Sequence, residues 1–306
     1  MSEQNQTNNK LLPYDLSGKV TSPNLIVFLH GYPDNNRLWD NIFPAHEKEN
    51  LVLRMSYPNY DKRMQEKWGR TFPDIIKGIK ATIDHVKEDR DYKIFFVAHD
   101  WGAYITYLFD KTYPNFINNG ITMDIGYKFP QSPGILIRIL SYQIYLALAF
   151  ILPAFIGNFM TSLFVQTFVV TKGHADIANI DEIDASMNYM YYYAYRTAFF
   201  QTAFFIVFFF LTETKLVFYS LLVLFMIYKV LTLGSSNPLA GYKPSFPLGY
   251  LYGEKKPFHF HNNKMLDYLK AKEKCEVIEV ANRGHWLMVD NEKQINEIIT
   301  RRLKDM

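Results

Sequence analysis

The sequence contains a single cysteine, Cys275, among 306 residues. One cysteine excludes an intramolecular disulfide framework and any zinc site built from several cysteines. The chain also lacks an excess of charge of one sign, because 33 lysine and arginine residues face 30 aspartate and glutamate residues, for a formal charge of +3. A nucleic-acid-binding protein would present a strongly basic face. We therefore expect no nucleic-acid partner.

The first residues lack an apolar run. Residues 1–9 are polar and contain no arginine, which argues against a secretory signal and a conventional transit peptide. The sequence also has no glycine-rich loop of the kind that binds phosphate groups. We expect neither a metal ion nor an organic cofactor, and we expect any membrane contact to come from inside the chain.

Apolar and aromatic residues are abundant instead. Hydrophobic residues make up 49% of the chain and aromatic residues 17%, with 25 phenylalanines and 22 tyrosines. This content excludes a disordered chain. The length suits one large domain, or a core domain with an insertion.

Predicted strands and helices alternate along much of the chain. Apolar runs rich in branched residues predict buried strands at 24–30, 51–57, 93–98, 120–124, 248–252 and 276–280. Helical patterns occur at 72–86, 101–113, 261–272 and 290–304. Such alternation indicates an α/β fold with a parallel sheet. We expect an N-terminal extension at 1–23, a core at 24–128 and 247–306, and an inserted apolar helical cap at 129–246.

A strand-to-helix elbow carries the main catalytic candidate, Asp100. The strand at 93–98 leads directly into the helix that begins near Trp101, so this side chain is presented at the carboxyl end of the sheet. Ala98 and Gly102 leave room for a tight turn. A carboxylate that attacks an alkyl carbon forms an ester that water can hydrolyse, which suits epoxides and alkyl halides. The alternative is that Asp100 only caps the helix.

Two further motifs follow strands at the same edge. His30-Gly31-Tyr32-Pro33 follows the first strand, and the amides of Tyr32 and Trp101 are candidates for an oxyanion hole, although a plain Gly-Pro turn would also explain this motif. Gly284-His285-Trp286 follows the last strand, where a loop histidine can meet the elbow. The order of nucleophile, insertion and histidine is that of the α/β-hydrolase fold.

On these residues the chain resembles α/β-hydrolases of the epoxide hydrolase and haloalkane dehalogenase group. The matching segments are HGYP (30–33), VAHDWGA (97–103) and RGHW (283–286), within a resemblance that covers about 24–128 and 247–304. The resemblance implies that Asp100 is the nucleophile and that His285 is the base that activates water. The aromatic residue after HG is similar to epoxide hydrolases, whereas dehalogenases more often have a halide-binding polar residue there.

One position departs from the family pattern. Most such hydrolases place an acid a few residues beyond the glycine that follows the strand before the histidine loop, and Lys256 stands there. Asp124, at the end of the strand after the nucleophile helix, is the favoured replacement, and Glu254 is the second candidate. Two alternatives remain: Asp124 only caps a loop, or the chain has no functional third acid.

The cap contains a cluster of tyrosines. In the related enzymes, cap tyrosines bind the epoxide oxygen and protonate it as the ring opens. The candidates here are Tyr191 and Tyr192, followed by Tyr195. Amphipathic packing or an interfacial aromatic belt would explain the same cluster.

Long apolar tracts predict that the cap contacts lipid. The stretch 139–171 has 33 residues without a charge, and further tracts occupy 197–212 and 216–233. About 20 apolar residues suffice to cross a bilayer, but Pro153 and Gly157 interrupt the first tract. Monotopic insertion is favoured over spanning helices and over a buried cap or oligomer interface.

Together these features predict a membrane-associated, intracellular hydrolase that opens a lipophilic epoxide. A dehalogenase uses the same aspartate and histidine, but it needs two N–H donors for the halide, and only the indole of Trp101 is evident. A catalytically degenerate subunit of a membrane assembly, with a membrane-protein partner, is the other alternative.

Overall fold

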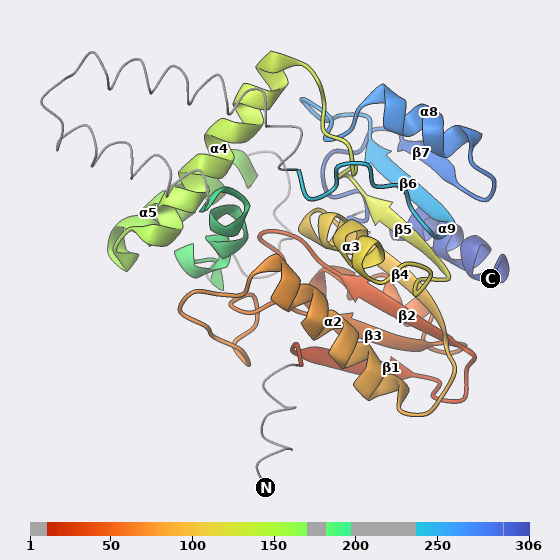
Figure 1. The fold of residues 1–306 in the computed structure, drawn as a ribbon. Coiled ribbons are helices and arrows are strands. Elements are labelled where there is room, and N and C mark those ends of the chain that lie inside the picture. Colours follow the sequence, from red (N-terminus) through yellow and green to blue (C-terminus); the bar gives the residue numbers. More distant parts are fainter. Residues whose placement is uncertain (1–10, 170–181, 197–236, 290) are drawn as a thin grey trace, which may run out of the picture.

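The computed structural model describes residues 11–169, 182–196, 237–289 and 291–306 (Figure 1). Seven strands of these residues form one sheet in the order β1-β3-β2-β4-β5-β6-β7. β1 is antiparallel to β3, and all other neighbouring pairs are parallel. The strands are β1 (Tyr14–Gly18), β2 (Asn24–Leu29), β3 (Leu51–Met55), β4 (Lys93–His99), β5 (Asn119–Met123), β6 (Leu248–Gly253) and β7 (Glu276–Val280).

Helices connect the parallel strands and also form the inserted region. The α/β class with a largely parallel sheet, predicted from the alternating pattern, is confirmed. The helices are α2 (Phe72–Lys87), α3 (Trp101–Thr112), α4 (Pro133–Ile151), α5 (Ala154–Phe164), α8 (Asn263–Ala271) and α9 (Glu292–Lys304). Short helical turns occur at Asn36–Trp39, Phe43–Ala45, Val165–Val169 and Ala185–Asn188.

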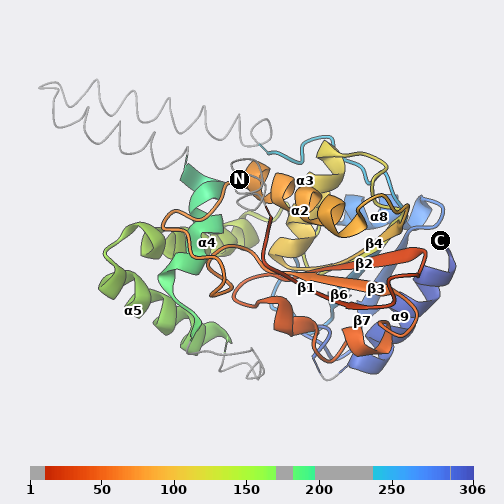
Figure 2. The same cartoon turned by 90° about the horizontal axis from the view of Figure 1, so that it is seen from below.

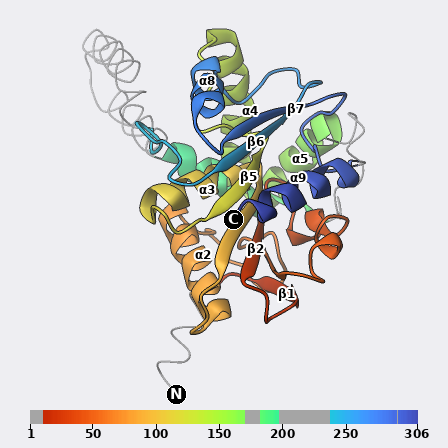
Figure 3. The same ribbon diagram turned by 90° about the vertical axis from the view of Figure 1, so that its right-hand side faces the viewer.

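Two hydrophobic cores cover the two faces of the sheet. Val27 of β2 and Phe96 of β4 enter the core beneath α2, α3 and α8, whereas Phe28 and Val97 enter the core beneath α9 (Figure 3). All four side chains are completely buried. Since both faces are covered, the central strands are continuous apolar runs, which is why the sequence pattern reveals them.

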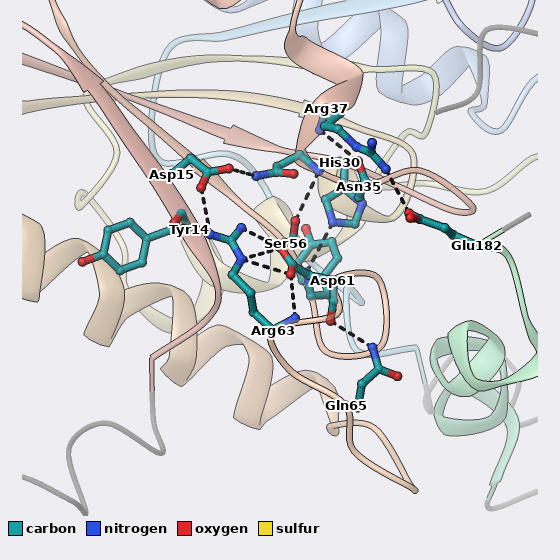
Figure 4. A network of polar contacts seen from close by, with 12 residues as sticks. Tyr14, Asp15, His30, Asn35, Arg37, Ser56, Asp61, Arg63, Gln65 and Glu182 are labelled. Atoms are coloured by element: carbon teal, nitrogen blue, oxygen red, sulfur yellow. Dashed lines mark hydrogen bonds and ion pairs between the residues drawn. The ribbon is translucent and has the colours of Figure 1, made fainter. Parts of the chain in front are cut away.

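The edge strand β1 lies inside the segment expected to be an extension. Its sequence, YDLSG, is only partly buried and has no run of branched apolar residues, so the sequence pattern did not predict it. The guanidinium of Arg63 joins Asp15 of β1, at 2.8 Å, to Asp61, at 2.6 Å (Figure 4). These ion pairs tie the edge strand to the loop that follows β3.

The inserted region begins after β5 and packs beyond one end of the sheet, where α4 and α5 lie side by side (Figure 2). The two helices meet closely at Gly157, where a Cβ atom would lie 2.2 Å from the carbonyl oxygen of Ala149. Glu182 of the insertion forms an ion pair of 2.9 Å with Arg37 of the core (Figure 4). The insertion is therefore anchored to the core by polar contacts as well as by packing.

Much of the surface of α4 and α5 is apolar. α4 is long and apolar enough to cross a membrane by length and composition, with a mean hydropathy of 1.8, and 22% of it is buried. The predicted tracts at 197–212 and 216–233 lie outside the described residues. The exposed large apolar side chains of the two helices and their junction are Ile137, Ile144, Leu148, Ile151, Leu152, Phe155, Ile156, Phe159 and Leu163.

The start of α3 depends on a glycine. A Cβ atom at Gly102 would lie 2.5 Å from the carbonyl oxygen of Leu29, which belongs to rigid backbone. We expect Gly102→Ala to lower the free energy of unfolding by about 1–3 kcal/mol, because the helix must move away from β2. Urea denaturation measures this loss. The matched control is Gly134→Ala, since nothing lies within 4 Å of a Cβ there. Equal stability of the two variants would contradict the close approach.

Candidate active site

Asp100 occupies the turn between β4 and α3 in an unusual backbone conformation. Its φ is 52° and its ψ is −120°, a region that a residue with a side chain rarely adopts. It stands at the N-cap position of α3, but its side chain makes no capping hydrogen bond. Capping therefore does not explain the aspartate. The side chain is buried and lines a cavity instead.

The loop after β2 lies directly against this turn. A Cβ atom at Gly31 would lie 2.3 Å from the Cβ atom of Asp100, so only glycine fits. The backbone amide of Trp101 favours the ionised carboxylate of Asp100 and lowers its pKa. The amide of the adjacent Tyr32 has no acceptor among the described residues. The loop after β2 and the start of α3, which carry the two amides predicted for the oxyanion hole, therefore lie next to each other.

His285 is brought to the elbow by the loop after β7. Its Nε2 atom lies 3.9 Å from Oδ2 of Asp100, which is close but longer than a hydrogen bond. Its Nδ1 atom lies 2.5 Å from Oδ2 of Asp124. Asp124 directly follows β5 and has a φ of 73°. The three residues proposed as nucleophile, base and acid are therefore in one cluster.

Glu254, the second candidate for the acid, is directed elsewhere. It is exposed, and its Oε2 atom accepts a hydrogen bond of 2.9 Å from the backbone amide of Asn282. Asp124 is thus the carboxylate that contacts His285.

Lys256 contacts the same carboxylate. Its ammonium donates to Oδ2 of Asp124, the oxygen that also faces His285. Both partners are buried, with side-chain exposures of 4% for Lys256 and 0% for Asp124. The sequence marked Lys256 as a departure from the family pattern, but it gave no indication that this lysine pairs with the replacement acid.

Burial and charge shift the carboxyl groups in opposite directions. Burial raises the pKa of Asp100 to about 6, against the attraction of His285, and the charge of Asp124 raises it further. Asp124 is buried more completely than Asp100, yet the charges of Lys256 and His285 hold its pKa well below the usual range. Near neutral pH both carboxylates are therefore ionised.

Two other polar groups of the site were not predicted from the sequence. Asp34 is buried and accepts a hydrogen bond of 2.8 Å from the indole of Trp286, and burial raises its pKa to about 7. The ring of His99 lies against the ring of His285, with centroids 4.6 Å apart. Burial lowers the pKa of His99 to about 3, so its imidazole stays neutral. The sequence signal that could have identified them is their position, because Asp34 directly follows the HGYP motif and His99 is part of the HDWG motif.

A cavity of about 1490 Å³ opens beside the catalytic cluster. Its wall includes Asp100 and His285 from the core, together with Tyr142 of α4 and Leu163 of α5. The apolar side chains Ile137 and Leu163 line the cavity and are also exposed at the surface. Space for a substrate therefore exists between the core and the insertion.

The three tyrosine candidates occupy different places. Tyr191 lines the cavity and packs edge-on against Tyr32 and Trp101, with ring centroids 5.2 Å away from each. Tyr192 packs against Phe150 and is not part of the cavity wall. The hydroxyl of Tyr195 donates to Gln143 and is also outside that wall.

Tyr142 is a cavity tyrosine that was not among the candidates. Its ring centroid lies 6.3 Å from that of Tyr191, and its hydroxyl accepts a hydrogen bond of 3.1 Å from Gln143. Burial raises the pKa of both Tyr142 and Tyr191 well above the usual value, so both phenols stay protonated. The apolar run around Tyr142 concealed it, because nothing in its spacing separates a cavity residue from a packing residue.

The sheet, the elbow and the histidine loop together agree with one family. The sequence profile described as Alpha/beta hydrolase family matches residues 26–298. The chain belongs to the alpha/beta hydrolase family. A comparison with curated proteins finds no match.

Solved structures with a similar fold include esterases and dehalogenases. A thermophilic esterase from Thermogutta terrifontis superposes with a TM-score of 0.61 at 12% identity, over 96% of this chain and 93% of that chain. A loop variant of a haloalkane dehalogenase from Bradyrhizobium elkanii superposes with a TM-score of 0.56 at 15% identity, over 94% and 90%. A marine microorganism esterase gives 0.60 at 12%, over 95% and 99%. At these identities the likeness concerns the fold.

The buried pair of Asp124 and Lys256 makes a prediction about stability. We expect Asp124→Asn to cost about 3–5 kcal/mol, because it leaves the ammonium buried without a counter-charge. The double variant with Lys256→Met should recover more than half of that loss in urea denaturation. As a control, Asp84→Asn removes an exposed ion pair to Lys80 and should change stability by about 0.5 kcal/mol or less. Additive losses in the double variant would count against a coupled pair.

Proposed function

We propose that this hydrolase opens a lipophilic epoxide through a covalent ester on Asp100. The observation that carries the proposal is a carboxylate at the nucleophile elbow, 3.9 Å from the imidazole of His285 and open to a cavity. A serine at this position would form a stable ether with an alkyl carbon, whereas an aspartate forms an ester that water can cleave.

In the first step, a carboxylate oxygen of Asp100 attacks one ring carbon, and the bond from that carbon to the epoxide oxygen breaks. Oδ1 of Asp100 is buried and has no hydrogen-bond partner among the described residues. The departing oxygen takes the phenolic proton of Tyr191 or Tyr142, which both stay protonated until then. The products are a hydroxyalkyl ester and a tyrosinate.

In the second step, His285 takes a proton from water, and the resulting hydroxide attacks the ester carbonyl carbon of Asp100. Asp124 holds the ring through Nδ1 and stabilises the imidazolium. The amides of Tyr32 and Trp101 bind the oxyanion that forms. Collapse breaks the bond between the carbonyl carbon and the alkyl oxygen and leaves Asp100 as a carboxylic acid, which loses its proton to solvent and becomes the carboxylate again. The diol leaves after its oxygen is protonated by the imidazolium, and the tyrosinate regains its proton from solvent.

Dehalogenation is the second candidate, because it uses the same aspartate and histidine. It requires two N–H donors aimed at the halide. The indole of Trp101 can supply one, but the indole of Trp286 is already bonded to Asp34. Tyr32 offers no side-chain N–H at the position after His30-Gly31. These contacts favour the epoxide, while the open cavity argues against a degenerate, non-catalytic subunit.

A trapping experiment tests the ester mechanism. We expect His285→Gln incubated with trans-stilbene oxide to accumulate a protein adduct whose mass is increased by one epoxide molecule, because the ester forms but water is not activated. Mass spectrometry of the intact protein and of the peptide that contains Asp100 detects it. Asp100→Asn should show neither adduct nor turnover.

The control for that experiment is His85→Gln, which changes an exposed histidine on α2. It should turn over the epoxide at the parent rate without accumulating an adduct. If the parent protein hydrolyses the epoxide but His285→Gln forms no adduct, the two-step mechanism is wrong. Halide release from an alkyl bromide without epoxide turnover would favour dehalogenation.

The insertion supports a further part of the proposal, which is monotopic contact with a membrane. Phe155 and Phe159 of α5 are 77% and 68% exposed, and α4 is mostly unburied, unlike the core helix of a globular domain. Ile137 and Leu163 belong both to this apolar surface and to the cavity wall. A lipophilic substrate can therefore pass from the bilayer into the cavity without crossing water.

Vesicle flotation tests the membrane contact. We expect the protein to float with phosphatidylcholine vesicles, and we expect Phe155→Ser with Phe159→Ser to weaken binding by about tenfold or more, because burial of each ring is worth about 1.5–3 kcal/mol. The control is Val20→Ser, which changes an exposed apolar residue near β1. Equal flotation of all three proteins would place the contact elsewhere.

A further inference from the structure

Two carboxylates of the proposed ester mechanism are buried close to a single ammonium. Asp100 must be ionised to attack, and Asp124 must be ionised to hold His285. The charge of Asp124 disfavours the ionised form of Asp100, whereas the charge of Lys256 favours it. Without a counter-ion, one of two neighbouring buried carboxyl groups tends to hold a proton.

A protonated imidazole could neutralise this pair, but it would then be unable to act as a base. Lys256 supplies a positive charge without occupying His285. Its ammonium is bonded to Oδ2 of Asp124 and lies 4.3 Å from the centre of the Phe260 ring. This ring offers a second favourable contact for a buried cation.

The position of the lysine is fixed by backbone contacts between two loops. Residue 125, after Asp124, forms a bridge with Phe260, and the amide of Gly126 donates 2.9 Å to the carbonyl oxygen of that residue. The amide of Lys255 donates 2.8 Å to the carbonyl oxygen of Arg283 in the histidine loop. The loop that carries the lysine is thus attached on both sides to the loops that carry the acid and the base.

The other buried titratable groups around these residues contribute little fixed charge, whereas Arg138, Lys255 and Arg283 are cationic residues of the same cavity wall. Burial keeps the tyrosines protonated and lowers the pKa of the nearby histidines, so these groups are neutral near pH 7, while Asp34 titrates near that pH. Besides His285, the groups that face Asp100 or Lys256 are Tyr32, Asp34, Tyr57, Tyr60, His99, Tyr142, Tyr191, His259 and His261.

We propose that Lys256 is the positioning residue that keeps Asp100 and Asp124 ionised together beside His285. Lys256 stands where the family pattern places an acid. In the proposed mechanism, Asp124 takes the role of that acid. The inference rests on the proposed ester mechanism, because it concerns the ionisation of the attacking carboxylate. Removal of the ammonium therefore affects ester formation most strongly at low pH.

The test measures ester formation as a function of pH in the His285→Gln protein with trans-stilbene oxide, where the adduct accumulates and the histidine no longer titrates. When Lys256→Met is added, the pH below which the rate of ester formation falls should rise by about one unit. On this acidic limb of the profile, the rate at a given pH is then about tenfold lower. The rate at high pH should stay near that of the parent. Lys256→Arg keeps the charge and should keep the profile.

Two further variants serve as controls. One removes both charges of the buried pair, and the other removes a lysine elsewhere on the surface. Asp124→Asn with Lys256→Met removes both charges, leaves no buried orphan and should move the midpoint of the acidic limb back toward that of the parent. Lys264→Met removes an exposed lysine from α8 and should change nothing. Circular dichroism verifies the fold of each variant.

The outcomes separate this inference from the mechanism on which it rests. An unchanged acidic limb in Lys256→Met, or an equal loss at every pH, would overturn the role of Lys256 while leaving the ester mechanism in place. Failure of the His285→Gln protein to form an ester at any pH would overturn the ester mechanism, and this inference with it.

Discussion

The candidate site depends on the contacts of one carboxylate oxygen that is buried away from water. Oδ2 of Asp124 contacts both the imidazole of His285 and the ammonium of Lys256. A carboxylate buried without a partner would move into solvent or take up a proton, because desolvation of an isolated carboxylate costs several kcal/mol. The parallel sheet resolves this by bringing the loops after β5, β6 and β7 to one edge. The acid, its counter-ion and the base therefore come from three consecutive strands in the sheet order.

Sequence reasoning succeeded where the chemistry is local. The place of Asp100 at a tight turn was predictable because a buried strand, a small residue and a helix start stand next to each other, and its φ of 52° agrees with that turn. The central strands were identifiable because burial on both faces leaves a continuous apolar run. β1 was missed, because an edge strand of mixed sequence lacks that signal. The fold class thus followed from periodicity, but the edge of the sheet did not.

Prediction was weaker where a residue's role depends on long-range pairing. Lys256 appeared to remove a functional group, since a lysine cannot orient an imidazole. Its partner, Asp124, is 132 positions away, and no local pattern links the two. The tyrosines show the same limit. Tyr191 and Tyr192 are neighbours in sequence, yet one lines the cavity and the other packs against Phe150, because adjacent residues on a helix point in different directions.

The insertion and the charged cluster impose complementary requirements on a substrate. The cavity wall combines Asp100 with apolar side chains of α4 and α5, and it also includes the basic residues Arg138, Lys255 and Arg283. In the proposed mechanism, the reactive carbon of the substrate must pass the apolar side chains to reach a buried carboxylate. An epoxide is uncharged, accepts a hydrogen bond from a phenol and becomes polar only as its ring opens. In the proposed mechanism, charge therefore develops beside Asp100, His285 and the cavity tyrosines, which stabilise it.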